Sequence, residues 1–200
     1  MSESNRSARR QNLTRLVLSA LCAALAYVVF TFLRINIPLP GGGQTSVHLG
    51  NAIVVLAAML LGGVWGGVGG AIGLTIGDLF DPRYLLSAPK TFVMKFLIGL
   101  ITGLVAHRIC HITKKAEPKK YFPGALASSI AALLFNAVCD PIVGYYYKLW
   151  ILGKPAADLT LWPNFLVTAI NSVISIIVAT ILYMALRPAL EKAHLLPKIR

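Results

Sequence analysis

Long uncharged stretches alternate with short polar segments along this chain of 200 residues. No Asp, Glu, Lys or Arg occurs from 35 to 77 or from 159 to 186, whereas one helical membrane crossing needs only about 20 apolar residues. Clusters of proline and glycine, and the charged residues, divide the remaining apolar sequence. The pattern predicts helices at 13–34, 47–64, 66–80, 91–108, 124–147 and 164–187. The expected fold is therefore an all-α integral membrane protein with six transmembrane helices.

The number of crossings depends on the apolar stretch 47–80. As a single helix it would be about 50 Å long, too long for a hydrocarbon core of roughly 30 Å. Gly62-Gly63 and Gly66-Gly67 are the points where it can fold back. With six crossings, thirteen of the 19 basic residues fall on one side of the membrane and five on the other, with Lys95 inside a helix. The positive-inside rule then predicts that both termini are cytoplasmic, with basic tails at 1–12 and 188–200 around a membrane domain at 13–187.

Composition supports this interpretation and limits the function. Hydrophobic residues make up 56% of the chain and charged residues 13%, and the mean hydropathy is +0.71. A net charge of +12 would suggest nucleic acid in a soluble protein, but these basic residues flank apolar stretches without an aromatic platform, so no nucleic-acid partner is predicted. The odd set Cys22, Cys110 and Cys139 implies no disulfide framework.

The sequence contains none of the common catalytic or nucleotide-binding motifs that we considered. There is no H-E-x-x-H, no G-x-S-x-G and no Walker motif. His107, Cys110 and His111 have a helical spacing but supply only three potential ligands, so we predict interfacial histidines and no metal site. A binder or carrier is favoured over an enzyme, with no catalytic residues and no catalytic cofactor. Any ATP would be hydrolysed by a partner chain.

Glycine is concentrated between 62 and 78, in the sequence GGVWGGVGGAIGLTIGD. The spacing matches neither a dinucleotide fingerprint nor a P-loop. It forms four-residue rows, Gly62-Gly66-Gly70, Gly69-Gly73-Gly77 and Gly63-Gly67-Ala71. Small residues at this spacing let membrane helices approach closely, so we expect the third helix to be packed centrally. The first helix carries a related stripe, Ala20 with Ala24 and Ser19 with Ala23, which fits either internal packing or an external partner helix.

Polar residues inside the predicted helices fall almost entirely in the outer half of the membrane. Such groups usually face a cavity and pair with one another or with a ligand. Asn136 and Asp140 share one helical face, as do Asn164, Thr168 and Asn171. Lys95 could instead form a structural ion pair with Asp78 or Asp140, and the nearby aromatic residues fit an interfacial belt. The candidate substrate-binding residues are Gln44, His48, Asn51, Asp78, Tyr84, Lys95, Asn136, Asp140, Tyr146, Asn164 and Asn171.

Three segments resemble a known family: INIPLPGGGQTSVHLGNAIVVLAAMLLG, GVWGGVGGAIGLTIGDLF and YLLSAPKTFVMKFLIGLITGLVA. They are similar to the S components of energy-coupling factor transporters, the substrate-binding subunits of ABC-type vitamin importers in prokaryotic plasma membranes. The resemblance covers about 15–187 and is strongest between 35 and 106.

The resemblance implies partners and roles. An S component binds its vitamin at the outer face, docks on a transmembrane coupling subunit and two cytoplasmic ATPases, topples in the membrane and releases the vitamin inward. Ala20 and Ala24 match the family's docking motif, and 36–47 matches its lid. Riboflavin, cobalamin and other vitamins all remain open as the ligand.

A secondary carrier or proton-coupled permease is the alternative. It would use Asp78, Lys95 and Asp140 as a proton relay, and it would be expected to contain inverted repeats. The sequence shows no second copy of the glycine-rich hairpin in the last three predicted helices.

Overall fold

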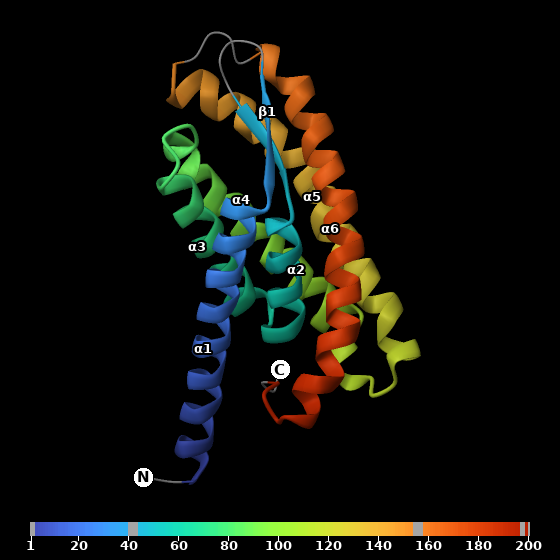
Figure 1. Cartoon of the computed structure of the whole chain (residues 1–200). Helices are drawn as coiled ribbons and strands as arrows, with labels where there is room; N and C mark the ends of the chain where they lie inside the picture. The colour runs from blue at the N-terminus through green and yellow to red at the C-terminus, as the bar shows by residue number, and fades with distance from the viewer. Residues whose placement is uncertain (1–2, 40–43, 154–157, 197–198, 200) are drawn as a thin grey trace.

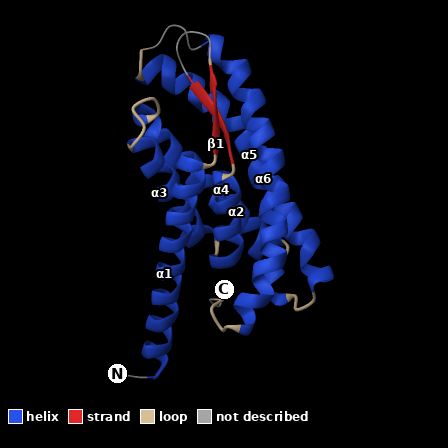
Figure 2. Cartoon of the chain, viewed as in Figure 1, coloured by secondary structure: helices blue, strands red, loops and turns tan. Residues whose placement is uncertain are grey.

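A computed structural model describes residues 3–39, 44–153, 158–196 and 199. Long helices run along one direction of the molecule, and a two-stranded sheet stands at one end (Figure 1). Figure 2 shows how little of the described chain is neither helix nor strand. Within the described residues, the α-helices are α1 (Glu3–Phe32), α2 (Gly50–Leu61), α3 (Gly63–Leu79), α4 (Ala88–Gly103), α5 (Pro118–Tyr146) and α6 (Asp158–Lys192). The strands are β1 (Arg34–Pro38) and β2 (Gln44–His48).

The helices agree with the expected ones in order but differ at their ends. Helix α1 begins at Glu3, so most of the expected N-terminal tail is helical. Two helices run on as π-helical turns, α4 into Leu104–Ile109 and α5 into Tyr147–Ile151. Helix α5 also begins earlier than expected, because Pro118 occupies its first turn, where a proline costs no hydrogen bond.

Helix α2 occupies the centre of the bundle. All of its 12 residues are buried, whereas α3 keeps Val64, Ile72 and Ile76 exposed. The expectation that the third helix is the central one is therefore wrong. The reason is that α2 contacts all five other helices, whereas α3 packs mainly on α1, α2 and α4 and leaves its remaining face exposed.

The three glycine rows of α3 each face a different helix. A Cβ added at Gly70 would lie 2.9 Å from Val54 Cα of α2, and one at Gly69 would lie 2.6 Å from the carbonyl oxygen of Ser19 in α1. On the α4 side, a Cβ at Gly67 would lie 3.3 Å from Gly99 Cα. These approaches confirm that the four-residue spacing serves backbone contact between helices. Gly62 makes the turn between α2 and α3 with φ +92°, a conformation that favours glycine.

The hairpin β1–β2 was not expected from the sequence. Its strands are antiparallel, with Arg34 opposite His48 and Pro38 opposite Gln44. Prolines and glycines between 38 and 43 indicated a loop, and strands of five residues are too short to give a clear alternation. The glycines at 41–43 lie outside the described residues. The hairpin leads directly into α2 and lies beside the upper part of α6 (Figure 1).

Four helical segments in the described chain are long and apolar enough to cross a membrane: 9–32, 85–109, 118–151 and 158–192. Helix α2 is shorter, because 12 residues extend only about 18 Å. The hairpin runs from the start of α2 toward the end of the molecule opposite the two chain termini (Figure 1). Strand β2 and α2 together therefore take the place of the longer helix expected at 47–64. Large apolar residues stay exposed along α1, α5 and α6, as expected for surfaces that face lipid.

Helix α1 begins and α6 ends at one end of the bundle, and the hairpin stands at the other (Figure 1). The connection between α4 and α5 also lies at the first end, because Arg187 of α6 donates hydrogen bonds to the carbonyl oxygens of Ile112 and Lys115 at 3.0 and 2.7 Å. The guanidinium of Arg187 lies 3.9 Å from the ring centroid of Tyr121. These contacts fix the end of the bundle where basic residues are concentrated.

Candidate functional site

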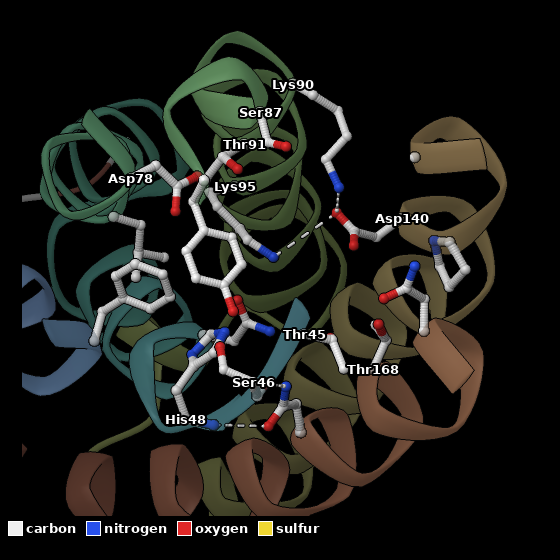
Figure 3. Close-up of a pocket in the computed structure, with 18 of the residues that line it drawn as sticks. Thr45, Ser46, His48, Asp78, Ser87, Lys90, Thr91, Lys95, Asp140 and Thr168 are labelled. Atoms are coloured by element: carbon white, nitrogen blue, oxygen red, sulfur yellow. Dashed lines mark hydrogen bonds and ion pairs between the residues drawn. The ribbon is translucent and has the colours of Figure 1, made fainter. Parts of the chain in front are cut away.

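A cavity of about 130 Å³ lies between the hairpin and helices α1 to α6, with Phe30 as the lining residue from α1. Side chains from β2, α2, α3, α4, α5 and α6 converge on it (Figure 3). Nine of the eleven candidate residues line it: Gln44, His48, Asn51, Asp78, Tyr84, Lys95, Asp140, Asn164 and Asn171. The predicted convergence of polar groups from distant parts of the sequence is present in the structure.

Two lysines of α4 approach Asp140 of α5. Lys90 Nζ lies 3.1 Å from Asp140 Oδ1, and Lys95 Nζ lies 4.0 Å from the same oxygen. Lys95 donates to Asn136 Oδ1 at 3.3 Å. Asn136, which is fully buried, therefore lies behind Lys95 and not in the cavity wall. Of the two lysines, Lys90 makes the closer ion pair with Asp140.

Asp78 enters the cavity from the opposite side, near the C-terminal end of α3. Its side chain is only 3% exposed, and among the described residues it forms no ion pair within 4.0 Å. Thr91 of α4 lies beside it (Figure 3). Figure 3 shows Lys95 between the carboxylates of Asp78 and Asp140. A buried carboxylate facing a cavity is a strong acceptor for a donor group in a ligand.

Asn171 of α6 fixes the base of the hairpin over the cavity. Its Oδ1 accepts a hydrogen bond from the backbone N–H of His48 at 2.9 Å, and its Nδ2 donates to the carbonyl oxygen of Ser46 at 2.8 Å. The imidazole of His48 packs edge-on against Phe30, with ring centroids 4.8 Å apart. Gln44, Ser46 and His48 alternate along β2, which brings them to the cavity face of the strand.

A cluster of charges joins the hairpin to the connection after α3. Asp81 accepts hydrogen bonds from Arg34 at the start of β1 and from Arg83, whose Nη2 lies 2.7 Å away. Arg83 also donates to Gln44 Oε1 at 3.0 Å. The hydrogen bonds from Arg83, together with Arg34, hold the pKa of Asp81 well below its ordinary value. The cluster ties both strands to the rim of the cavity.

Tyr146, like Asn136, is a candidate that does not line the cavity, and it lies on the surface of the protein. It is 43% exposed and packs on Trp150, with ring centroids 4.6 Å apart. Tyr146 follows Asp140 by six positions, which on a helix rotates it about 120° away from the face that lines the cavity. Trp150 is 74% exposed, in keeping with the expected interfacial belt.

Several lining residues were absent from the sequence-based set, among them Lys90, Thr91 and Ser46. A signal for two of them existed. Thr91 precedes Lys95 by four positions and so shares its helical face, and Ser46 shares a strand face with His48. Lys90 lacked such a signal, because it lies in the first turn of α4. There the direction of its side chain depends on how the preceding segment enters the helix.

The small residues of α1 divide between two faces. Ser19 packs inward, with its hydroxyl donating to the carbonyl oxygen of Trp65 at 2.7 Å, and Ala23 meets Gly73. Ala20 and Ala24 are exposed and line a groove of about 400 Å³ between α1 and α3. The structure is therefore compatible with both hypotheses for the stripe: Ser19 and Ala23 pack inside the protein, and Ala20 and Ala24 are accessible to a partner helix.

Comparison with known proteins gives one match. Residues 10–188 match the family described as the ECF-type riboflavin transporter, S component. No curated protein and no solved structure matches the chain significantly. The family match begins within α1, ends within α6 and includes the hairpin and helices α2 to α5. The cavity with its convergent polar groups is the kind of site that a substrate-binding subunit needs. The chain therefore belongs to the ECF-type riboflavin transporter S-component family, and it is a vitamin-binding membrane subunit of a transporter and not an enzyme.

Proposed function

We propose that this chain captures a vitamin or vitamin precursor in the cavity beneath the hairpin and delivers it to an ATP-driven energising module. The observation that carries this proposal is the convergence of buried polar side chains from β2 and five helices on one cavity. In a bundle whose outer surface is apolar, such groups are costly unless they bind a ligand or one another. Asp78, which has no described ion-pair partner, is the clearest example.

We propose six crossings with both termini cytoplasmic. Three segments lie at the end of the bundle opposite the hairpin: the start of α1, the end of α6 and the connection between α4 and α5. Thirteen of the 19 basic residues belong to these segments. The positive-inside rule then directs the hairpin and its cavity to the outer face of a prokaryotic plasma membrane. Substrate would enter from outside the cell.

The hairpin serves as the lid over the cavity. Its base is held by Asn171 and its outer edge by the cluster around Asp81. Arg83 is half exposed where it meets Gln44, and hydrogen bonds between exposed side chains contribute little net stability. The Arg83–Gln44 contact can therefore break at low cost, while the buried contacts of Asn171 and of Arg34 with Asp81 hold the base of the hairpin.

Ala20 and Ala24 form the docking surface for the transmembrane coupling subunit. They are exposed next to an apolar groove, and small side chains at four-residue spacing allow a partner helix to approach the backbone closely. Two cytoplasmic ATPases bound to that subunit would supply the energy. The vitamin is the transported ligand, and this chain itself needs no catalytic cofactor.

Uptake in cells tests this assignment. Cells that express the chain together with an energising module should accumulate the vitamin, and cells without the ATPases should not. Replacing Ala20 and Ala24 by leucine should abolish uptake but leave ligand binding to the purified chain intact, since neither residue lines the cavity. Uptake that persists without the ATPases would instead indicate a secondary carrier or proton-coupled permease.

A matched control uses two exposed residues on another face of the bundle. Ile177 and Ile181 of α6 are exposed at the same four-residue spacing. Replacing both by leucine should leave uptake unchanged. Equal losses from the two pairs would show that the alanine stripe has no special role in docking.

A further inference from the structure

A groove of about 820 Å³ lies at the end of the bundle opposite the hairpin, far from the cavity described above. It is bounded by α1, by the turn that joins α2 to α3, and by the end of α4. Helix α1 extends past that turn on one side of the groove (Figure 1). Among the described residues that line it there is no Asp or Glu. We call it the basic groove, and its lining includes Gln11, Asn12, Arg15, Trp65, Leu104 and Arg108.

The two arginines of the basic groove lie where the apolar parts of their helices end. Arg15 is the last charged residue before the uncharged residues 16–32 of α1, and Arg108 is the first after the uncharged residues 96–107. Both belong to segments that are long and apolar enough to cross a membrane. Arginine side chains near the ends of such helices extend to the membrane–water interface. In a bilayer, both guanidinium groups would therefore lie at the level of the phospholipid phosphates.

His107 also lines the basic groove, but its ring is engaged within the protein. Its Nε2 lies 3.1 Å from the carbonyl oxygen of Ala58, and its Nδ1 lies 3.2 Å from the hydroxyl oxygen of Thr113. Arginine, in contrast, keeps its charge at every physiological pH. Arg15 and Arg108 are therefore the groups in the lining that can hold an anion.

Apolar side chains continue the basic groove toward the middle of the membrane. Leu100, Leu104 and Arg108 follow one another at four-residue spacing, so they form a stripe that ends in the charged residue. Leu104 is 55% exposed, and Val64 at the start of α3 is 59% exposed, although both line the groove. A soluble anion such as phosphate would leave this apolar surface uncovered. A phospholipid covers it, because its acyl chains extend from the phosphate toward the membrane centre.

We propose that the basic groove binds an anionic phospholipid of the cytoplasmic leaflet, with its phosphate held by Arg15 and Arg108. A guanidinium can donate two parallel hydrogen bonds to phosphate oxygens, and basic pockets between transmembrane helices on the cytoplasmic side bind anionic head groups. The inference uses the membrane orientation proposed above and is independent of vitamin capture. Trp65 lines both this groove and the one beside Ala20 and Ala24, so the lipid would lie next to the proposed docking surface.

Native mass spectrometry with defined lipids tests the inference. The purified full-length chain in detergent is titrated with phosphatidylglycerol, which is anionic, or with phosphatidylcholine, which has no net charge. We expect the first phosphatidylglycerol to bind about ten-fold or more tightly than the first phosphatidylcholine. Arg15→Gln and Arg108→Gln should each weaken that binding step by about ten-fold, as expected for hydrogen bonds between charged groups. An equal affinity for the two lipids would overturn the inference.

The matched control removes the same charge from exposed positions. Arg9 and Arg10 of α1 are exposed and do not line the basic groove. A double variant with glutamine at both positions should keep the preference for phosphatidylglycerol, whereas the double variant Arg15→Gln, Arg108→Gln should lose it. Equal losses in the two double variants would overturn the inference, because overall basic charge would then explain the preference. Melting temperatures without lipid distinguish a binding defect from a folding defect.

A second measurement leaves both arginines intact. In a chain that carries Trp150→Phe and Trp162→Phe, Trp65 is the only remaining tryptophan. Phosphatidylglycerol with brominated acyl chains should quench its fluorescence more strongly than brominated phosphatidylcholine at the same mole fraction, and equal quenching would contradict the proposal. Excess inorganic phosphate should not reverse the quenching. Reversal by phosphate would show that the groove binds a soluble anion, and it would also overturn the inference.

Discussion

Replacing Gly69 by alanine tests how α1 and α3 are held together. A Cβ at this position would lie 2.6 Å from the carbonyl oxygen of Ser19. Carbon and oxygen atoms in close helix contacts are usually about 3.3–3.6 Å apart. The two helices would therefore have to separate locally by about 0.7–1.0 Å. The obstacle is backbone, so no side-chain rotation can relieve it.

The energetic cost has two sources and one offset. Overpacking of this size costs about 1–3 kcal/mol. Separation would also stretch the hydrogen bond from the Ser19 hydroxyl to the Trp65 carbonyl, now 2.7 Å long, at a cost of about 0.5–1.5 kcal/mol. Alanine regains up to about 1 kcal/mol of helix propensity over glycine. With the full helix-propensity offset, the net destabilisation expected is about 0.5–3.5 kcal/mol, or a melting temperature lower by about 1–14 °C.

The assay is thermal unfolding of the purified chain in detergent without ligand, followed by tryptophan fluorescence. Gly144→Ala is the control, because a Cβ there would meet only the flexible side chain of Lys90, with Nζ at 3.5 Å and Cδ at 4.0 Å. That variant should match or exceed the wild-type melting temperature. A Gly69→Ala protein as stable as Gly144→Ala would refute the reasoning that close backbone contact holds α1 on α3.

Three further predictions concern the hairpin and the basic end of the bundle. Asn171→Ala removes the two hydrogen bonds from Asn171 to β2 and should destabilise the hairpin by about 1–3 kcal/mol. Amide hydrogen exchange at 44–48 should therefore accelerate, and unchanged exchange would show that these hydrogen bonds do not hold the hairpin. Asp81 has a lowered pKa because of its hydrogen bonds to two arginines, so its contribution to stability is complete above its unfolded pKa of about 3.9 and declines as the pH falls further. Melting curves between pH 7 and 3 should show this acid decline in the wild type but less of it in Asp81→Asn, and parallel profiles would exclude the effect. Arg187→Gln removes a guanidinium that donates to two carbonyl oxygens of the α4–α5 connection, so Cys110 should react faster with a maleimide reagent; an unchanged rate would show that the connection is held by other contacts.

The sequence predicted the helix contacts of α3 because helical geometry alone determines which residues share a face. Gly69 and Gly73 are four positions apart and both meet α1, while Gly66 and Gly70 meet α2. The same periodicity put Asp140 and Asn171 on helical faces that line the cavity, but it did not distinguish Asp140 from Asn136, which shares its face and does not line the cavity. Four-residue spacing on a helix is local information, and a single sequence contains it.

The hairpin and the centre of the bundle depended on contacts that the sequence does not reveal. The strands are held by pairing with each other and by Asn171, which is more than a hundred positions away. Prolines and glycines in that segment indicate a turn but not the partner strand. Position along the helix axis was not enough to predict whether Tyr146 lines the cavity. Tyr146 lies between the lining residues Gly144 and Lys148, but its side chain is on the exposed face of α5.

The sequence likewise did not determine which of Lys90 and Lys95 forms the closer ion pair with Asp140. Both lysines lie in the N-terminal half of α4, and both could have paired with Asp78 or Asp140. Their distances to Asp140, 3.1 and 4.0 Å, show that Lys90 takes the closer ion pair and that Lys95 is shared with Asn136. Charge balance within a cavity is a property of distances, and residue type alone does not determine it.

The central claim is that one small molecule binds between the hairpin and the surrounding helices. Native mass spectrometry of the full-length chain, purified from cells in rich medium and released from detergent micelles, tests this claim most directly. The account predicts a mass increase that corresponds to one bound small molecule in the wild type, and its loss in the double variant Asp78→Asn, Lys95→Met. A wild-type chain that never carries a small molecule, or a double variant that retains the same one, would contradict it.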